Sequence, residues 1–232
     1  MLLQHHLLGW YPWEITPSPK PGAANAPVKS PRRPATTAFF LGVPPARFNS
    51  NRPNKYVLSL VGLPGSGKST VGRQLARRLQ LPFADADQAI EQRLGCPIRE
   101  FFEREGEARF RDIEQEVIAQ LCASHQGVLA TGGGAVLRPE NRAQLRAAGA
   151  VVYLKSQPED LMRRLRHDSK RPLLQVADPM AALRLLQAQR DSLYRETAHI
   201  VVETGRPSVS TLVNLILAQL ELAPPQDLNS PP

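Results

Sequence analysis

Apolar residues recur along the chain in short runs, and each run is followed by a segment with helical spacing. Four of the runs are nearly continuous, and a fifth is mixed and ends in two acids; they lie at 56–61, 81–87, 127–130, 150–154 and 199–202. Such runs are typical of strands buried on both faces of a parallel sheet. The intervening segments place apolar residues three and four apart, as amphipathic helices do. This alternation predicts a doubly wound α/β domain.

A glycine-rich segment directly follows the first apolar run. Residues Gly62–Thr70 match the spacing G-x-x-x-x-G-K-S/T, and Val71, Leu75 and Leu79 begin a helical stripe after it. In this P-loop pattern, backbone N–H groups surround phosphate oxygens, the lysine bridges phosphates and the hydroxyl after it ligates Mg²⁺. The context of strand, loop and helix therefore predicts nucleotide binding. The candidate phosphate-binding residues are Gly65, Ser66, Gly67, Lys68, Ser69 and Thr70.

Two acids end the second predicted strand. Asp85 and Asp87 are two residues apart, so both can face the cleft at the carboxyl ends of the strands, where open α/β sheets bind ligands. Asp87 could equally cap the helix that begins after it. The residues alone leave both interpretations open.

Two further positions are candidates for ligand contact. The strand at 127–130 runs into Gly132, Gly133 and Gly134, and a turn of three glycines allows a ligand to approach the backbone closely. Arg111 lies at the edge of an apolar stripe in a helix predicted over 107–118, where an ordinary solvated charge is the alternative.

The late part of the chain contains a basic segment between two predicted helices. A helix over 158–167 carries Arg164, and the segment after it is polar, basic and stopped by a proline next to Arg171. Mobile basic loops close over phosphates in many phosphotransferases, so residues 166–177 are a candidate lid. A long helix at 179–197 follows, with Leu183, Leu186, Arg190 and Leu193 along one side.

Charge and cysteine content exclude some functions. The net charge is +8, but residues 1–55 account for +6 of it, so the domain itself shows no excess typical of nucleic-acid binding. No apolar run approaches the roughly 18 residues needed to cross a bilayer. Cys96 and Cys122 have no metal-ligand spacing and are expected to be reduced thiols of a cytosolic protein.

The ends of the chain differ from the middle. Residues 1–54 are rich in proline without a sustained apolar period, which predicts a disordered N-terminal extension. A targeting segment, or a stretch upstream of the natural start, are alternatives that composition does not separate. Residues 223–232 are expected to form a disordered tail. The predicted domain therefore spans 55–222.

Together these motifs resemble, in order and without a missing member, those of the shikimate kinases, and the match extends over about 56–222. The motifs are Gly62–Thr70, Asp85–Asp87, Phe110–Arg111, Thr131–Gly134, Arg171–Leu174 and Leu193–Arg195. The resemblance implies a P-loop fold with five parallel strands in the order 2-3-1-4-5 and a mobile lid. It also implies ATP-dependent phosphorylation of the 3-hydroxyl of shikimate, in the pathway to chorismate and the aromatic amino acids. The expected protein is a cytoplasmic monomer that uses Mg²⁺ and binds neither nucleic acid nor membrane.

The same resemblance implies roles for the donor side of the site. Lys68 and Ser69 would hold the ATP phosphates and Mg²⁺, and Asp85 would reach the metal through water. Arg164 would lie against adenine. Arg171 would come from the lid to the transferring phosphoryl group and act in catalysis with Lys68.

On the acceptor side, the resemblance implies that Asp87 binds the ring hydroxyls and takes the proton from the 3-hydroxyl. Arg111 and Arg195 would bind the shikimate carboxylate, and the glycines at 132–134 would contact the ring. Arginine forks suit a planar anion of this kind. Alternatives are a kinase of another small polar acceptor such as gluconate, and a binding protein of the same fold without catalysis.

Overall fold

A five-stranded parallel sheet forms the centre of the molecule. The computed structural model describes residues 56–165, 178–205 and 207–222, so the N-terminal extension, the lid with Arg171 and the C-terminal tail lie outside the described residues. The strands β1 (Val57–Val61), β2 (Phe83–Asp85), β3 (Gly127–Ala130), β4 (Val151–Lys155) and β5 (Ile200–Glu203) pair in the order β2-β3-β1-β4-β5. The predicted strand order is confirmed.

The strand pairing follows from the burial of the apolar runs. All residues of β1 and β3 are buried, and β1 pairs with β3 from Val57 opposite Gly127 to Leu60 opposite Ala130. Neighbouring pairs are likewise parallel. All five strands therefore end at one edge of the sheet, where a doubly wound fold binds its ligands.

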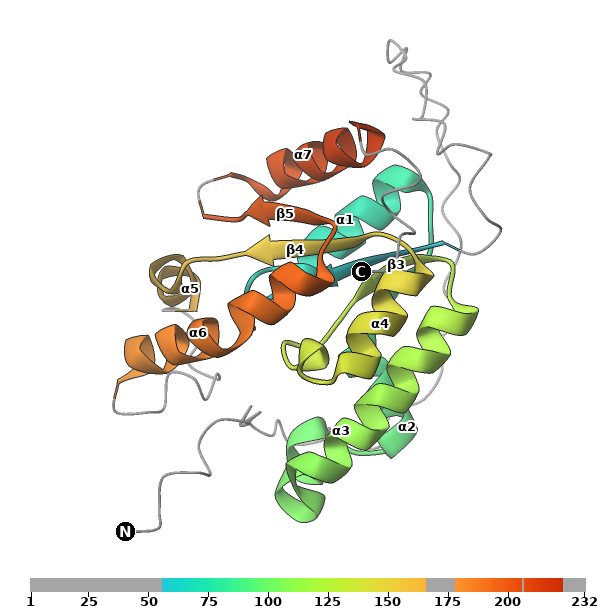
Figure 1. Ribbon diagram of the computed structural model, residues 1–232, viewed down its shortest axis with the longest axis vertical. Coiled ribbons are helices and arrows are strands. Elements are labelled where there is room, and N and C mark those ends of the chain that lie inside the picture. Colours follow the sequence, from blue (N-terminus) through green and yellow to red (C-terminus); the bar gives the residue numbers. More distant parts are fainter. Residues whose placement is uncertain (1–55, 166–177, 206, 223–232) are drawn as a thin grey trace, which may run out of the picture.

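Helices cover both faces of the sheet (Figure 1). On one face, α1 (Lys68–Leu79) and α7 (Val209–Leu222) bury their apolar stripes against alternate residues of β1, β4 and β5. On the other face lie α3 (Ile98–Ser124), α4 (Pro139–Ala148), α5 (Pro158–Leu165) and α6 (Pro179–Thr197). A short helix, α2 (Ala86–Leu94), packs mainly against α3. Within the described ranges, no helix is long and apolar enough to cross a bilayer.

One predicted boundary differs from the structure. The sequence predicts a helix over 107–118, whereas α3 runs from Ile98 to Ser124 with a kink at Gly106. Gly106 has φ 81°, a conformation that glycine adopts without strain. The kink turns the chain before Glu107, so that the second part of α3 faces the sheet edge where the strands end.

Candidate functional site

The phosphate loop joins β1 to α1 and depends on two glycines. Gly65 and Gly67 have φ values of 78° and 94°, which are accessible to glycine but strained for other residues. The loop ends at Lys68, the first residue of α1, so the helix N-terminus points at the space above the loop. Backbone N–H groups and the positive end of the helix dipole together make an anion site.

Lys68 is buried beside this loop. Its Nζ donates hydrogen bonds to the carbonyl oxygens of Gly62 at 2.9 Å and Leu63 at 3.0 Å. The ammonium group is therefore fixed over the loop by the loop's own backbone. A cation held in this way is placed to meet phosphate oxygens without a large change of the main chain.

Ser69 and Asp85 bring two oxygen ligands together. The Ser69 hydroxyl donates to Asp85 Oδ2 at 2.7 Å, although the residues are 16 positions apart in the chain. Asp85 also caps α2, because its Oδ1 accepts from the Asp87 backbone N–H at 3.2 Å. The cap is thus Asp85, and the Asp87 carboxylate is not used for it. Hydroxyl and carboxylate oxygens suit Mg²⁺, so the donor set fits the metal expected from the sequence.

The Asp87 side chain points at the glycine turn after β3. A Cβ on Gly132 would lie 2.7 Å from Asp87 Oδ1 and 3.1 Å from Glu114 Oε1, so only glycine leaves room for these carboxylates. Burial, together with the neighbouring Asp85 and Glu114, raises the pKa of Asp87 to about 7, although Lys68 opposes the shift. A carboxyl group with a pKa near neutrality can accept a proton during a reaction and release it afterwards.

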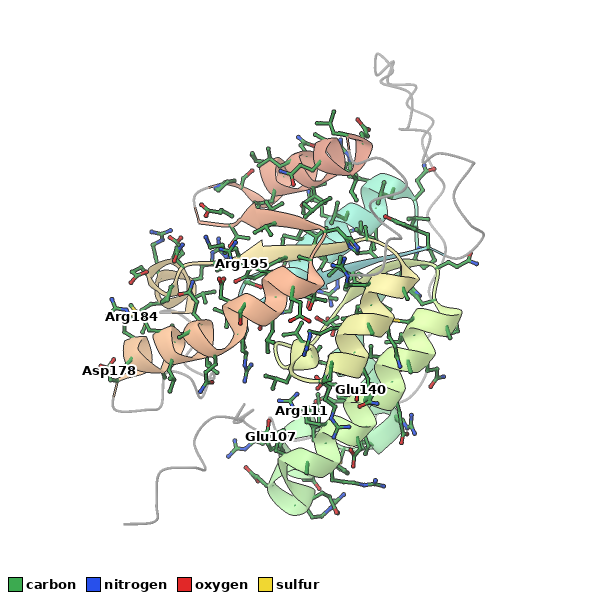
Figure 2. The ribbon with its side chains drawn as sticks, in the orientation of Figure 1. Glu107, Arg111, Glu140, Asp178, Arg184 and Arg195 are labelled. Carbon is green, nitrogen blue, oxygen red and sulfur yellow. The ribbon has the colours of Figure 1, made fainter. Side chains whose placement is uncertain are left out.

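Arg111 is buried on α3 and held by two acids of the same helix. Its Nη1 donates to Glu114 Oε2 at 2.6 Å, and its Nη2 donates to Glu107 Oε1 at 3.1 Å; Figure 2 shows Arg111 and Glu107 together. The guanidinium lies so close to Gly134 that any side chain there would collide with it. Arg111 is therefore not the solvated charge that the sequence allowed. The ion pairs fix its direction toward the glycine turn.

The glycine turn is anchored on several sides. Thr131 donates from Oγ1 to the Leu60 carbonyl at 3.0 Å, which ties the start of the turn to β1. After the turn, the short 3-10 helix η1 (Ala135–Leu137) is held by two residues of α4. Asn141 donates to the Ala135 carbonyl and Arg142 to the Val136 carbonyl, each at 2.9 Å. The backbone of the turn is thus tied to its neighbours before and after the glycines.

Helix α6 offers two arginines for the acceptor, Arg195 as expected from the sequence and Arg190 as placed by the structure. Arg195 is exposed on α6 and pairs with Asp191 at 2.6 Å (Figure 2). Arg190, one turn and one residue earlier, is buried and donates from Nη1 to the Gly133 carbonyl at 3.1 Å. A five-residue separation on a helix turns two side chains well apart, so both cannot face the turn. The arginine that α6 brings to the glycines is Arg190.

The two sides of the site meet in one cleft of about 550 Å³. Arg164 from α5 lies at its outer end, where its Nη1 donates to the Ser66 carbonyl at 3.5 Å and to Thr204 Oγ1 at 3.3 Å. The lining residues come from the phosphate loop, the ends of β2 and β3, and the segment that leads into α7. They include Gly65, Lys68, Ser69, Asp87, Thr131, Gly133, Arg164, Pro207 and Leu212.

Two site residues were not found from the sequence, Glu114 and Arg190. Both interrupt apolar helical stripes: Glu114 lies between Ile113 and Val117, and Arg190 follows Leu186 at a spacing of four. A charged residue in a buried stripe must have a partner, because an unpaired buried charge is costly. This interruption is the signal that could have identified them.

Comparison with known proteins gives one family for this chain. A family model described as shikimate kinase matches residues 64–221. A shikimate kinase of Paracidovorax citrulli is 59% identical over 169 residues, which cover 72% of this chain and 92% of the relative. Another, from Ralstonia nicotianae, is 59% identical over 163 residues and covers 70% of this chain and 86% of the relative.

Two solved structures extend the comparison. A shikimate kinase from Acinetobacter baumannii in complex with shikimate is 44% identical, with a TM-score of 0.68, and the match covers 73% of this chain and 94% of that one. A shikimate kinase from Aquifex aeolicus is 34% identical, with a TM-score of 0.63 and coverage of 71% and 96%. The segment matched by the family model includes every candidate site residue of this chain.

Proposed function

Because this chain belongs to the shikimate kinase family, we propose that it transfers the γ-phosphoryl group of ATP to the 3-hydroxyl of shikimate. The products are shikimate 3-phosphate and ADP. One observation carries the acceptor side of this proposal: each of the three glycines after β3 is met by at least one charged side chain. Asp87 meets Gly132, Arg190 meets Gly133 and Arg111 meets Gly134.

This arrangement suits a small ring that carries hydroxyls and one carboxylate. Arg111 and Arg190 are buried guanidinium groups on two different helices, so they can bind a carboxylate from two sides. Charge-assisted hydrogen bonds of this kind are stronger than neutral ones. Glycines allow the flat face of a ring to lie on the backbone. Arg190 therefore takes the carboxylate role that the resemblance had suggested for Arg195.

The Asp87 carboxylate fixes the attacking hydroxyl. The 3-hydroxyl oxygen forms a bond to the γ-phosphorus, the bond from phosphorus to the β,γ-bridging oxygen breaks, and the hydroxyl proton passes to Asp87. Phosphoryl transfer demands mainly in-line positioning and stabilisation of charge on the phosphoryl oxygens. Lys68 supplies a fixed positive charge beside the phosphate loop.

The nucleotide occupies the other end of the cleft. The phosphate loop and the N-terminus of α1 bind the phosphates, and Arg164 lies where the base would extend toward Pro207. Ser69 and Asp85 would hold Mg²⁺, which supplies positive charge to the phosphate oxygens when bound. These assignments rest on the donor atoms of this chain and on the family.

A coupled assay of ADP release tests the proposal. The full chain is incubated with ATP and Mg²⁺ and with shikimate, gluconate or AMP as acceptor. We expect release of ADP that depends on shikimate and is far slower with the other two. Activity only on another acceptor would refute the assignment of the carboxylate site. If no acceptor gave ADP release in protein that still binds ADP, a binding protein of this fold would be favoured.

A further inference from the structure

The carbonyl oxygen of Gly133 accepts hydrogen bonds from two side chains of α6. Tyr194 donates from its hydroxyl at 2.6 Å and Arg190 from Nη1 at 3.1 Å. The two residues are four apart, so they lie on the same face of the helix. Tyr194 is fully buried and Arg190 nearly so. Two donors therefore converge on one backbone oxygen in the middle of the glycine turn.

Such a double anchor fixes the direction of a peptide plane. Glycines on both sides of the bond between Gly133 and Gly134 leave their backbone little steric preference, so this plane could otherwise rotate at low cost. The peptide group is planar and trans, so holding the carbonyl toward α6 directs the Gly134 N–H away from α6. Gly134 is also the glycine against which Arg111 packs.

The Tyr194 hydroxyl is a reliable donor throughout the working range of pH. Burial raises the pKa of Tyr194 to about 12, so the hydroxyl keeps its proton near neutrality. The ring itself is held by Tyr153 of β4, with ring centroids 4.9 Å apart and planes inclined by 26°. The tyrosine pair is thus rigid, and the hydroxyl of Tyr194 meets Gly133 from a fixed position.

The second tyrosine of the pair sends its hydroxyl elsewhere. Tyr153 donates to Asp191 Oδ1 at 2.9 Å, and Asp191 Oδ2 accepts from the exposed Arg195 at 2.6 Å. The two stacked tyrosines therefore donate to different groups. The Tyr194 hydroxyl bonds to the turn where the acceptor is expected, and the Tyr153 hydroxyl bonds to an acid of a surface ion pair.

We propose that Tyr194 is a positioning residue for the acceptor, whose hydroxyl, with Arg190, holds the Gly133 carbonyl so that the glycine turn and both arginines meet the shikimate carboxylate in a fixed geometry. This inference rests on the proposed function. It assigns Tyr194 no direct contact with the substrate. The Tyr194 hydroxyl reaches the acceptor half of the cleft through Gly133, whereas the two rings also pack in the same core cluster as Leu63 of the phosphate loop. Removing a hydroxyl while keeping its ring therefore tests the acceptor half alone.

The matched variants Tyr194→Phe and Tyr153→Phe test this inference in the full-length chain. Each removes one hydroxyl and keeps both rings. For Tyr194→Phe we expect the KM for shikimate to rise about tenfold, as the loss of a buried hydrogen bond to a ligand-binding segment would produce, while the KM for ATP stays unchanged. For Tyr153→Phe we expect less than about a twofold change in either KM, even if its melting temperature falls by as much as that of Tyr194→Phe.

The outcomes separate the inference from the function on which it rests. If the parent chain turns over shikimate and Tyr194→Phe has the same KM for shikimate, the inference is wrong and the function stands. Equal rises in both variants, or a rise in the KM for ATP, would show a general structural effect and would also refute it. A parent chain silent on shikimate would overturn both.

A third substitution covers the case in which a Phe variant does not fold. Incorporation of 3-fluorotyrosine at position 194 keeps the ring and the hydroxyl but makes the hydroxyl a stronger donor. We expect the KM for shikimate to change by about twofold or more at position 194, and by less at position 153. The absence of any difference between the two positions would contradict the inference.

Discussion

The two halves of the cleft are built in different ways. The nucleotide half is made mostly from one continuous segment, Gly62–Thr70, whose backbone and glycine conformations form the anion site. The acceptor half is assembled from the end of β2, the middle of α3, the turn after β3 and the inner face of α6. Its working groups are side chains, of which Arg111 is fixed by acids of its own helix and Arg190 by the Gly133 carbonyl of another element.

This difference determines what a substitution does. In the nucleotide half, glycines with positive φ give the loop the shape that binds phosphate, and Lys68 is held by carbonyls of the same loop. In the acceptor half, every glycine is paired with a charged or polar side chain from elsewhere. The first half can therefore be damaged locally, whereas the second can be damaged from a distance.

Asp87→Asn should have the largest effect, because Asp87 faces both halves. We expect kcat for shikimate to fall about 10²–10⁴-fold, since the neutral amide oxygen holds the hydroxyl more weakly than a carboxylate and cannot take its proton. Both KM values should change by less than about threefold, because the arginines and the phosphate loop are intact. Steady-state kinetics measure this, with the melting temperature and ADP binding as checks of folding. A near-normal kcat would remove Asp87 from the mechanism.

Arg190→Lys and Arg195→Lys form the next pair. Lysine keeps the positive charge but not the planar fork, so Arg190→Lys should raise the KM for shikimate about 10–100-fold and leave the KM for ATP unchanged. Arg195→Lys alters an exposed ion pair with Asp191 and should change neither constant by more than about twofold. The reverse pattern would restore Arg195 as the carboxylate ligand and contradict the geometry of α6.

The same contrast explains which parts of the protein could be predicted from the sequence. The phosphate loop is a local pattern in which each residue type is required by backbone chemistry. Its role and its position between a strand and a helix could therefore be predicted from the sequence. The apolar runs predicted the strands and the resemblance to the family implied their order, which the structure confirms. Asp85 and Asp87 were predicted to lie together at a strand end, but only the structure shows that Asp85 is the cap.

The acceptor half was legible only in part. The assignment of Arg195 rested on its position in a motif, and on a helix a displacement of five residues changes the face that a side chain occupies. Which face of α6 meets the sheet edge is decided by tertiary packing of Leu183, Leu186 and Tyr194. Arg190 already stood in the apolar stripe of the sequence, but the sequence did not show that its partner is the Gly133 carbonyl.

Arg164→Ala should affect the nucleotide half alone. Arg164 is exposed and donates to the Ser66 carbonyl and to the hydroxyl and carbonyl of Thr204, so its removal should raise the KM for ATP about 3–10-fold and leave the KM for shikimate unchanged. The matched control is Arg163→Ala, because Arg163 is the neighbouring arginine and pairs with Asp160 at the surface. Equal effects of the two variants would place Arg164 outside the nucleotide site.

The smallest expected effect is on stability and concerns the cost of the acceptor half. The pKa of Asp87 is raised from 3.8 to about 7 in the folded protein, first by burial and then by Asp85 and Glu114. The folded state therefore binds a proton more tightly than the unfolded state, and this contribution to stability is present below about pH 4 and lost as pH rises through about 7. An asparagine carries no such cost. Asp87→Asn should thus melt a few degrees above the parent chain at pH 8, and the difference should shrink toward pH 4.

Asp191→Asn is the matched control for this measurement. Burial alone would raise the pKa of Asp191, but hydrogen bonds from Arg195 and Tyr153 lower it below its ordinary value of 3.8. Stability from Asp191 is then present above about pH 4 and is lost only below it, so this variant should be destabilised by a constant amount between pH 4 and 8. Thermal melts of the three proteins across that range separate the two carboxylates. If the melting-temperature difference between Asp87→Asn and the parent chain were also constant from pH 4 to 8, the Asp87 carboxylate would be no less stable than one at the surface. The crowded acids of the acceptor half would then carry no energetic cost.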